Sequence, residues 1–253
     1  MSTREIYDSL MADRKKLDIK GKSLLPKIIK QFKKENKFPA WKWVEYTHQQ
    51  SRNKYLIMYY SQSREQADKT SVQYVAFMEE DNQRLVIQWG CWPYRKHGAI
   101  EYIMTRSISF YCPHFFQRYR ERVWNNTNIS YNELLCRYFS RNNAAIPLEL
   151  NESIQRNFQK YDKLSLAFRQ RDGICFVRNA MEGEETTIGT PHDNTLNITV
   201  YYTIVTNSML FDEQEAAIKE GCKDYVVNDY NSVLNDTKRY AMLRYLNLTP
   251  IKN

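Results

Sequence analysis

The sequence predicts an α+β fold in which helices pack on an antiparallel sheet, with a helical N-terminal segment and a long C-terminal helix. Two observations indicate this class. Short runs rich in β-branched and aromatic residues alternate with polar turns, and segments with helical spacing lie before, between and after them. The 253 residues are also 42% apolar, which is enough for a packed core and excludes wholesale disorder.

The first 38 residues are expected to form a basic helical segment, followed by a single α+β domain over residues 39–253. This segment holds eleven Lys or Arg and five Asp or Glu, which is +6 of the formal net charge of +8. Leu24, Ile28 and Phe32 recur at helical spacing after Ser23, a candidate helix cap, and Pro26 suits an early helical position. The pattern predicts a basic amphipathic helix.

The lysines of this segment allow two interpretations. They form the solvated face of an ordinary helix, or they face an anion such as the phosphates of a nucleic acid. The candidate nucleic-acid contacts are Lys15, Lys16, Lys30, Lys33 and Lys34.

The middle of the chain predicts a run of strands. Tyr55–Tyr60 resembles a buried strand, and the alternating segments Ser71–Phe77 and Arg84–Trp89 flank a polar turn, which predicts a β-hairpin. Ala99–Phe110 is a further strand candidate. The aromatic residues of this region are interpreted as packing groups rather than as platforms for nucleobases. They are Trp41, Trp43, Trp89, Trp92 and Tyr94.

The second half alternates between helices and strands. Helices are predicted over Pro113–Trp124 and over Ser130–Tyr138, the latter opened by the cap signature Ser130-x-x-Glu133. Residues 143–172 are expected to be partly helical. Strands are predicted over Gly173–Arg178 and Leu196–Val205, the latter near the centre of a sheet. One helix is expected to begin at Asp212, and a long one to cover Asp224–Leu246.

Several kinds of site are not supported by any motif. The sequence has neither of the glycine-rich phosphate loops and no nucleophile elbow. Cys112 and His114 are the one close Cys/His pair, so no metal site and no cofactor are expected. No apolar run approaches the length of a membrane span, and five irregularly spaced cysteines favour reduced thiols, so the expected location is the cytoplasm, without a membrane partner.

The segment Cys112–Trp124 is the strongest candidate for chemistry. His114, Arg118 and Arg122 follow at i, i+4 and i+8, which places them on one face of a regular α-helix. In the first helical turn the helix dipole disfavours the imidazolium form of His114, so a neutral ring could take a proton from an RNA 2′-hydroxyl. The two arginines could then hold the charge that grows on the phosphate.

A structural interpretation of the same residues stays open. Arg118 and Arg122 could pair with Glu121, Glu133 or another surface acid, and His114 could cap or pack the helix.

The same run resembles a bacterial toxin family. His114-x3-Arg118-x3-Arg122, followed by Ile129-Ser130-x-x-Glu133, is similar to small domains related to the BrnT toxin, which resemble RelE-type ribonucleases. The resemblance covers about residues 105–210 and implies a RelE/barnase-like core. It also implies metal-independent cleavage of RNA, a protein antitoxin as partner, and a hydroxyl on the last strand, which Thr203 matches.

The sequence therefore supports two functional hypotheses. The first is a toxin-related, metal-independent endoribonuclease-like core with His114, Arg118, Arg122 and Thr203 as site residues. The alternative is a bacterial or mobile-element module that binds nucleic acid or protein without catalysis, in which the basic N-terminal helix carries the function.

Overall fold

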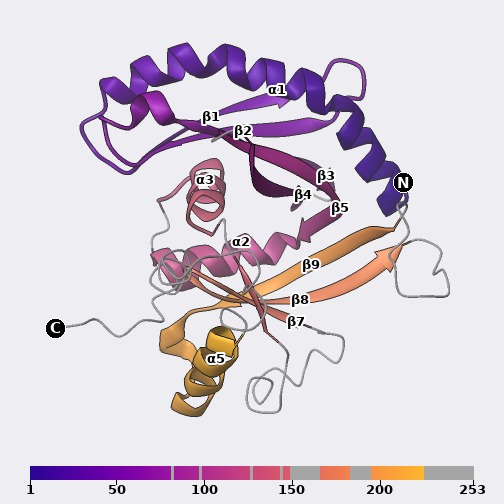
Figure 1. Cartoon of the computed structure of the whole chain (residues 1–253), viewed down its shortest axis with the longest axis vertical. Helices are drawn as coiled ribbons and strands as arrows, with labels where there is room; N and C mark the ends of the chain where they lie inside the picture. Colours follow the sequence, from indigo (N-terminus) through magenta and orange to yellow (C-terminus); the bar gives the residue numbers. More distant parts are fainter. Residues whose placement is uncertain are drawn as a thin grey trace. The chain divides into compact units, whose positions relative to one another are not determined.

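The computed structural model describes residues 1–80, 83–96, 99–125, 128–142, 145–148, 166–182 and 195–224 (Figure 1). The fold is mixed α/β, with a mostly antiparallel nine-stranded sheet in the order β1-β2-β3-β4-β5-β9-β8-β7-β6. The strands are β1 (Ala40–Thr47), β2 (Lys54–Ser61), β3 (Ser71–Glu80), β4 (Gln83–Lys96), β5 (Ala99–Tyr111), β6 (Ile146–Leu148), β7 (Leu166–Gln170), β8 (Gly173–Glu182) and β9 (Leu196–Val205). The α-helices are α1 (Thr3–Lys33), α2 (Pro113–Tyr119), α3 (Tyr131–Arg141) and α5 (Asp212–Asp224).

The chain divides into two compact units. The first comprises Met1–Phe116, Asn128–Ser140 and Ala180–Val200, and the second Gln117–Thr127, Arg141–Asn179 and Tyr201–Asn253. α1 therefore belongs to the same unit as the strands β1 to β5.

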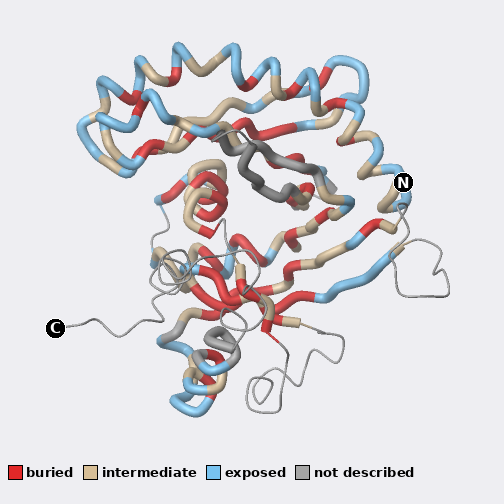
Figure 2. Tube along the Cα trace, viewed as in Figure 1, coloured by how far each residue is buried: buried red, intermediate tan, exposed pale blue. Residues whose placement is uncertain are grey.

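In the first unit, α1 packs along β2 and β3 (Figure 1). Its apolar side chains repeat every three or four residues, and the helix alternates between buried and exposed positions along its length (Figure 2). The buried groups of α1 meet strand side chains of one face of the sheet, including Tyr55, Ile57 and Tyr59, which are at most 1% exposed. This helix-on-sheet layer is the core of the first unit.

The predicted N-terminal helix is present, but the expected cap at Ser23 is wrong. α1 begins after Ser2, whose hydroxyl accepts from the backbone N–H of Glu5 at 3.2 Å while the Glu5 carboxylate accepts from the backbone N–H of Ser2 at 2.7 Å. Ser23 and Pro26 lie inside the helix. Burial of apolar residues on both sides of Pro26 outweighs the backbone hydrogen bond that a proline cannot make.

Most predicted strands are confirmed. The hairpin of β3 and β4 pairs Ala76 with Ile87, and β9 lies between β5 and β8, inside the sheet as predicted. β1 and the short strands β6 and β7 were not predicted. Residues 143–172 were expected to be partly helical; the described part of that range contains β6 and β7, and residues 149–165 lie outside the described residues. The predicted helix over Asp224–Leu246 lies, apart from Asp224, outside the described residues.

The predicted helix over Pro113–Trp124 is two elements. α2 ends at Tyr119, and Arg120–Trp124 is a π-helix, η2, closed by the backbone N–H of Asn125 on the Arg120 carbonyl at 3.0 Å. The following helix, α3, is confirmed together with its cap, because the backbone N–H of Glu133 donates to the Ser130 hydroxyl at 3.3 Å. The regular α-helical spacing behind the predicted His114, Arg118, Arg122 face therefore ends before Arg122.

Candidate functional site

The exposed side of α1 is a strip of lysines. The buried residues of the helix are centred on one side, and at 3.6 residues per turn the lysines occupy an arc of about 160° on the others. All of them are exposed (Figure 2). We call this strip the lysine face: Lys15, Lys16, Lys20, Lys22, Lys27, Lys30, Lys33 and Lys34. It contains the five lysines predicted to contact nucleic acid.

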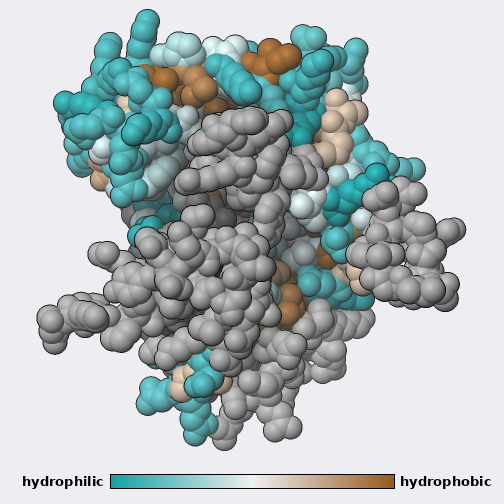
Figure 3. Space-filling model, viewed as in Figure 1, coloured by the Kyte–Doolittle hydropathy of each residue, from teal (hydrophilic) through white to brown (hydrophobic). Residues whose placement is uncertain are grey.

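Little negative charge opposes the lysine face. The acidic residues of α1 all precede Ile19, and none occurs between Ile19 and Lys34. Among the described residues, Lys33 pairs with Asp68 at 2.9 Å, and the Lys16 ammonium donates to the Gln50 side chain at 2.7 Å. Both members of the Lys33–Asp68 pair are more than half exposed, so the pair weakens the local positive potential only partly. In the space-filling view, hydrophilic side chains cover much of the surface over α1, with apolar patches between them (Figure 3).

A buried carboxylate fixes α1 to the sheet. Asp13 is 3% exposed and accepts hydrogen bonds from the Tyr55 hydroxyl at 2.8 Å, from the Asn53 amide at 2.9 Å and from the Ser51 hydroxyl. His48 Nδ1 lies 3.0 Å from the other carboxylate oxygen. Burial alone would raise the pKa of Asp13, but these hydrogen bonds outweigh it, so the pKa lies below its ordinary value.

A close approach of backbone and ring fixes the middle of the helix. The Tyr59 hydroxyl donates to the Gly21 carbonyl at 2.9 Å. A Cβ atom on Gly21 would lie 2.5 Å from the Tyr74 hydroxyl oxygen and 3.0 Å from a Val72 methyl. The lysine face is therefore carried by a helix held at two points, near Asp13 and at Gly21.

Two of the residues predicted as catalytic lie on α2. His114 is in the first turn and is exposed. Arg118 follows one turn later, with a half-exposed side chain whose Nη1 donates to Glu121 at 3.0 Å. Glu121 also accepts from the Gln117 amide, and both hydrogen bonds lower the pKa of its carboxyl. The expected pairing of Arg118 with Glu121 is present.

Arg122 and Thr203, both in the second unit, are brought together. Arg122 Nη1 donates to the Thr203 hydroxyl oxygen at 3.1 Å and to the Ile204 carbonyl at 2.5 Å. Thr203 is 8% exposed. This nitrogen of Arg122 donates both hydrogen bonds to β9, so the side chain connects the π-helix η2 to that strand.

A second buried carboxylate lies beside this region and was not predicted. Asp172, whose side chain is 3% exposed, accepts from the Tyr119 hydroxyl at 2.7 Å, from the Asn142 amide at 2.9 Å and from the Arg141 guanidinium. Burial alone would raise the pKa of Asp172, but the hydrogen bonds from Arg141 and Tyr119 outweigh it and lower the pKa. Sequence position gives no signal for this cluster, because its members come from three separate parts of the chain: α2, the C-terminal end of α3 and the β7–β8 turn.

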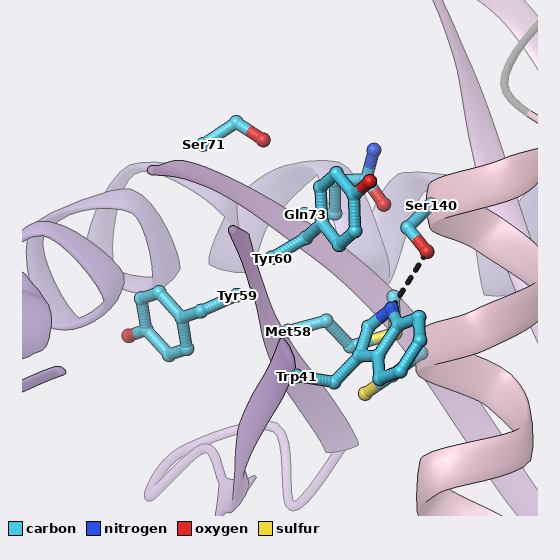
Figure 4. A pocket seen from close by; sticks show the side chains of 8 residues that line it. Trp41, Met58, Tyr59, Tyr60, Ser71, Gln73 and Ser140 are labelled. Atoms are coloured by element: carbon cyan, nitrogen blue, oxygen red, sulfur yellow. Dashed lines mark hydrogen bonds between the residues drawn. The ribbon is translucent and has the colours of Figure 1, made fainter. Parts of the chain in front are cut away.

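A small hollow in the first unit is lined by aromatic residues. Trp41 and Tyr60 lie side by side on neighbouring strands with ring centroids 6.0 Å apart, and Ser140 of α3 faces the indole (Figure 4). The Trp41 N–H donates to the Ser140 hydroxyl at 2.8 Å, and the Arg137 guanidinium lies 4.9 Å from the indole ring centre. The N–H of Trp41 and one face of its ring are therefore occupied within the protein, and the packing interpretation stays a prediction.

Within the described ranges, no group of three or more His, Cys, Asp or Glu side chains has the arrangement of a metal site. None of the described helices combines the length and the apolar character needed to cross a membrane. Comparison of the chain with models of protein families, with curated proteins and with solved structures gave no match.

Proposed function

We propose that this protein binds nucleic acid through the lysine face of α1. The observation that carries the proposal is the uninterrupted positive charge of residues 19–34, exposed on one side of a helix whose other side is buried in the core. From Lys15 to Lys34 the face extends about 29 Å at 1.5 Å per residue. Like charges this close repel one another, and phosphates relieve that repulsion.

An anionic membrane surface is the less suitable polyanion. Basic amphipathic helices bind bilayers by inserting an apolar face among the lipids. In α1 that face contains Leu17, Ile28 and Phe32, which are at most 4% exposed because the sheet covers them. The exposed side of α1 therefore presents positive charge to a partner, while the apolar face that a bilayer would need is buried against the sheet.

The proposal is tested by fluorescence anisotropy with a labelled RNA of about 20 nucleotides over a range of salt concentrations. We expect the logarithm of the association constant to fall linearly with the logarithm of salt concentration. Lys27→Gln and Lys30→Gln are expected to weaken binding and to make that slope shallower.

Lys54→Gln is the matched control, since Lys54 is an exposed lysine of β2 outside α1 that pairs with Glu79. It removes the same charge from the chain, and we expect it to bind like the wild type. Equal losses in Lys27→Gln and Lys54→Gln would mean that only the net charge matters. A flat salt dependence would exclude phosphate neutralisation altogether.

A second candidate function is metal-independent cleavage of RNA near α2. The observation that favours it is that His114 and Arg118, which belong to the run resembling BrnT-related domains, are both exposed one helical turn apart. In this proposal His114 takes the proton of a 2′-hydroxyl and the 2′-oxygen bonds to the adjacent phosphorus. The bond from phosphorus to the 5′-oxygen breaks, the 5′-oxygen takes a proton from water, and a 2′,3′-cyclic phosphate remains. Arg118 would hold the phosphate oxygens.

This second candidate is tested by incubating RNA with the protein in EDTA. We expect cleavage to persist in EDTA, to be lost in His114→Ala and to be absent on an otherwise identical 2′-deoxy substrate. Gln117→Ala, an exposed neighbour on the same helix, is the control and should cleave normally. Cleavage that stops with EDTA, or that His114→Ala retains, rejects the mechanism.

A further inference from the structure

The chemical content of the lysine face narrows the class of nucleic acid. Its outward positions hold ammonium groups together with Ile19, Ser23 and Pro26, and no aromatic ring. The two aromatic residues of α1 are turned elsewhere: Phe32 is fully buried, and Tyr7 packs against the core. Proteins that bind single strands gain much of their affinity from bases stacked on aromatic rings, so the lysine face lacks that contribution.

The face also lacks the groups that read bases in a groove. Bidentate recognition of guanine is mostly the work of arginine, whose planar fork a lysine does not have. Both arginines of α1 already have partners, because Arg4 donates to the Glu182 carbonyl at 3.0 Å and Arg14 lies 3.8 Å from Asp18. The lysine ammonium groups can neutralise phosphates, but they carry little sequence information.

The third observation is that α1 is held rigidly against the sheet. α1 is held at Asp13 and at Gly21, so the spacing of its lysines is set before any partner binds. A duplex presents about one phosphate charge per 1.7 Å of its axis in fixed rows, while a single strand has to lose conformational freedom to follow a rigid bar. Binding to a rigid helix face of about 29 Å therefore costs a duplex less conformational entropy than it costs a single strand.

We infer that the lysine face of α1 binds a double helix through its phosphates, without reading the sequence. This inference rests on the proposed function and specifies its substrate class. RNA and DNA duplexes share the recognised chemistry, and separate arms of the experiment distinguish them.

The first experiment compares duplex and single-stranded probes of about 16 nucleotides, as RNA and as DNA, each in two unrelated sequences. If about five phosphates are neutralised, the salt slope is near −4.5 for the duplex and near −3.5 for the single strand. We expect the duplex of at least one sugar type to bind about tenfold tighter than its single strand, and unrelated sequences to agree within about twofold. Tighter binding of the single strands, or a tenfold preference for one sequence, overturns the inference and leaves the proposed function standing. Absence of binding to all probes rejects both.

The second experiment adds a charge where the face lacks one. Ile19 is 61% exposed and lies near the middle of the arc occupied by the lysines, so a polar side chain there does not disturb the core. In Ile19→Lys we expect tighter duplex binding and a salt slope steeper by about 0.9, the value for one more neutralised phosphate. Ile19→Gln is the uncharged control and should bind duplex like the wild type. If Ile19→Lys leaves both affinity and slope unchanged, the outer side of α1 is not the duplex-binding surface.

Discussion

At the scale of single residues, the partners of buried polar groups decide what each group does. In the sequence, Asp13 does not differ from the other acidic residues of α1. In the fold it accepts hydrogen bonds from two side chains of the β1–β2 turn and from Tyr55 of β2. Arg122 was assigned from its four-residue spacing, yet its donor is engaged with β9, 81 residues later in the chain. Local spacing predicts which face a residue occupies on a regular helix, but contacts between distant segments depend on the whole fold.

The contact between Arg122 and Thr203 yields a prediction that separates a structural role from a catalytic one. We expect Arg122→Ala to lower the free energy of unfolding by about 1–3 kcal/mol, because it leaves the Thr203 hydroxyl and the Ile204 carbonyl without their donor. Thr203→Val should cost about 1 kcal/mol, and in the double variant the two losses should fall short of additivity by at least 0.5 kcal/mol, on the order expected for contacting residues. Urea denaturation measures all three values.

Arg118→Ala is the control for this cycle. Its exposed pair with Glu121 should be worth about 0.5 kcal/mol or less. If Arg122→Ala is as stable as Arg118→Ala, the hydrogen bonds to β9 do not support the fold, and Arg122 becomes available for the role in phosphate binding first predicted for it.

At the scale of elements, the sequence predicted the type of most segments and missed their irregularities. Strands such as β3 and β4 were predicted from the alternation in their sequences. In the fold both faces of each strand are buried where they pair, at Val75–Phe77 and at Val86–Ile87. The π-helix η2 was not predicted, because a single wider turn does not change the i, i+4 pattern of residue types in the sequence. β6 is only three residues long and β7 five, too short for periodicity to separate strand from helix.

The start of α1 shows a further limit of local signals. The sequence predicted a cap at Ser23, whereas the helix begins after Ser2, and the burial of Leu10 and Leu17 stabilises the part that precedes Ser23. The basic character of the segment, by contrast, was readable in full, and all five predicted lysines are exposed on the lysine face. Exposure of charged side chains on an amphipathic helix follows from its period alone.

The docking of α1 on the sheet gives a prediction at this scale. In Gly21→Val the new side chain meets the Tyr74 ring and a Val72 methyl, so we expect a loss of about 1–3 kcal/mol in the free energy of unfolding. Ser23→Ala, two residues along the same helix but exposed, should be neutral or slightly stabilising. Denaturant midpoints measure both. A stable Gly21→Val protein would contradict the close approach of α1 to β3.

At the scale of the whole molecule, the described residues of each unit include a buried carboxylate surrounded by donors. Asp13 serves this role in the first unit and Asp172 in the second, and in both the pKa lies below its ordinary value despite burial. These two groups therefore connect the stability of the chain to pH. The exposed acids with lowered pKa, such as Glu79 and Glu121, are solvated and contribute little.

The sign of this dependence follows from the direction of the shifts. A carboxyl whose folded pKa lies below its unfolded value, about 3.9 for Asp, stabilises the folded chain above that value. The stabilisation is lost as the pH falls through the folded pKa, because the unfolded state then binds more protons. We expect the free energy of unfolding, measured by urea titration, to be nearly level from about pH 7 to pH 5 and to fall steeply below about pH 4.

Two variants identify the groups responsible for that fall. Asp13→Asn and Asp172→Asn keep the side-chain shape but remove the titrating carboxylate, so each should be less stable than the wild type at pH 7 by about 2–4 kcal/mol. Each should also lose less stability than the wild type between pH 5 and pH 3, so that the curves converge in acid. Glu79→Gln, which removes an exposed acid whose lowered pKa is screened by solvent, should run nearly parallel to the wild type throughout. If Asp13→Asn and Asp172→Asn also run parallel to it, folding does not lower the pKa of these two carboxyls, and the hydrogen-bond clusters do not stabilise them as anions.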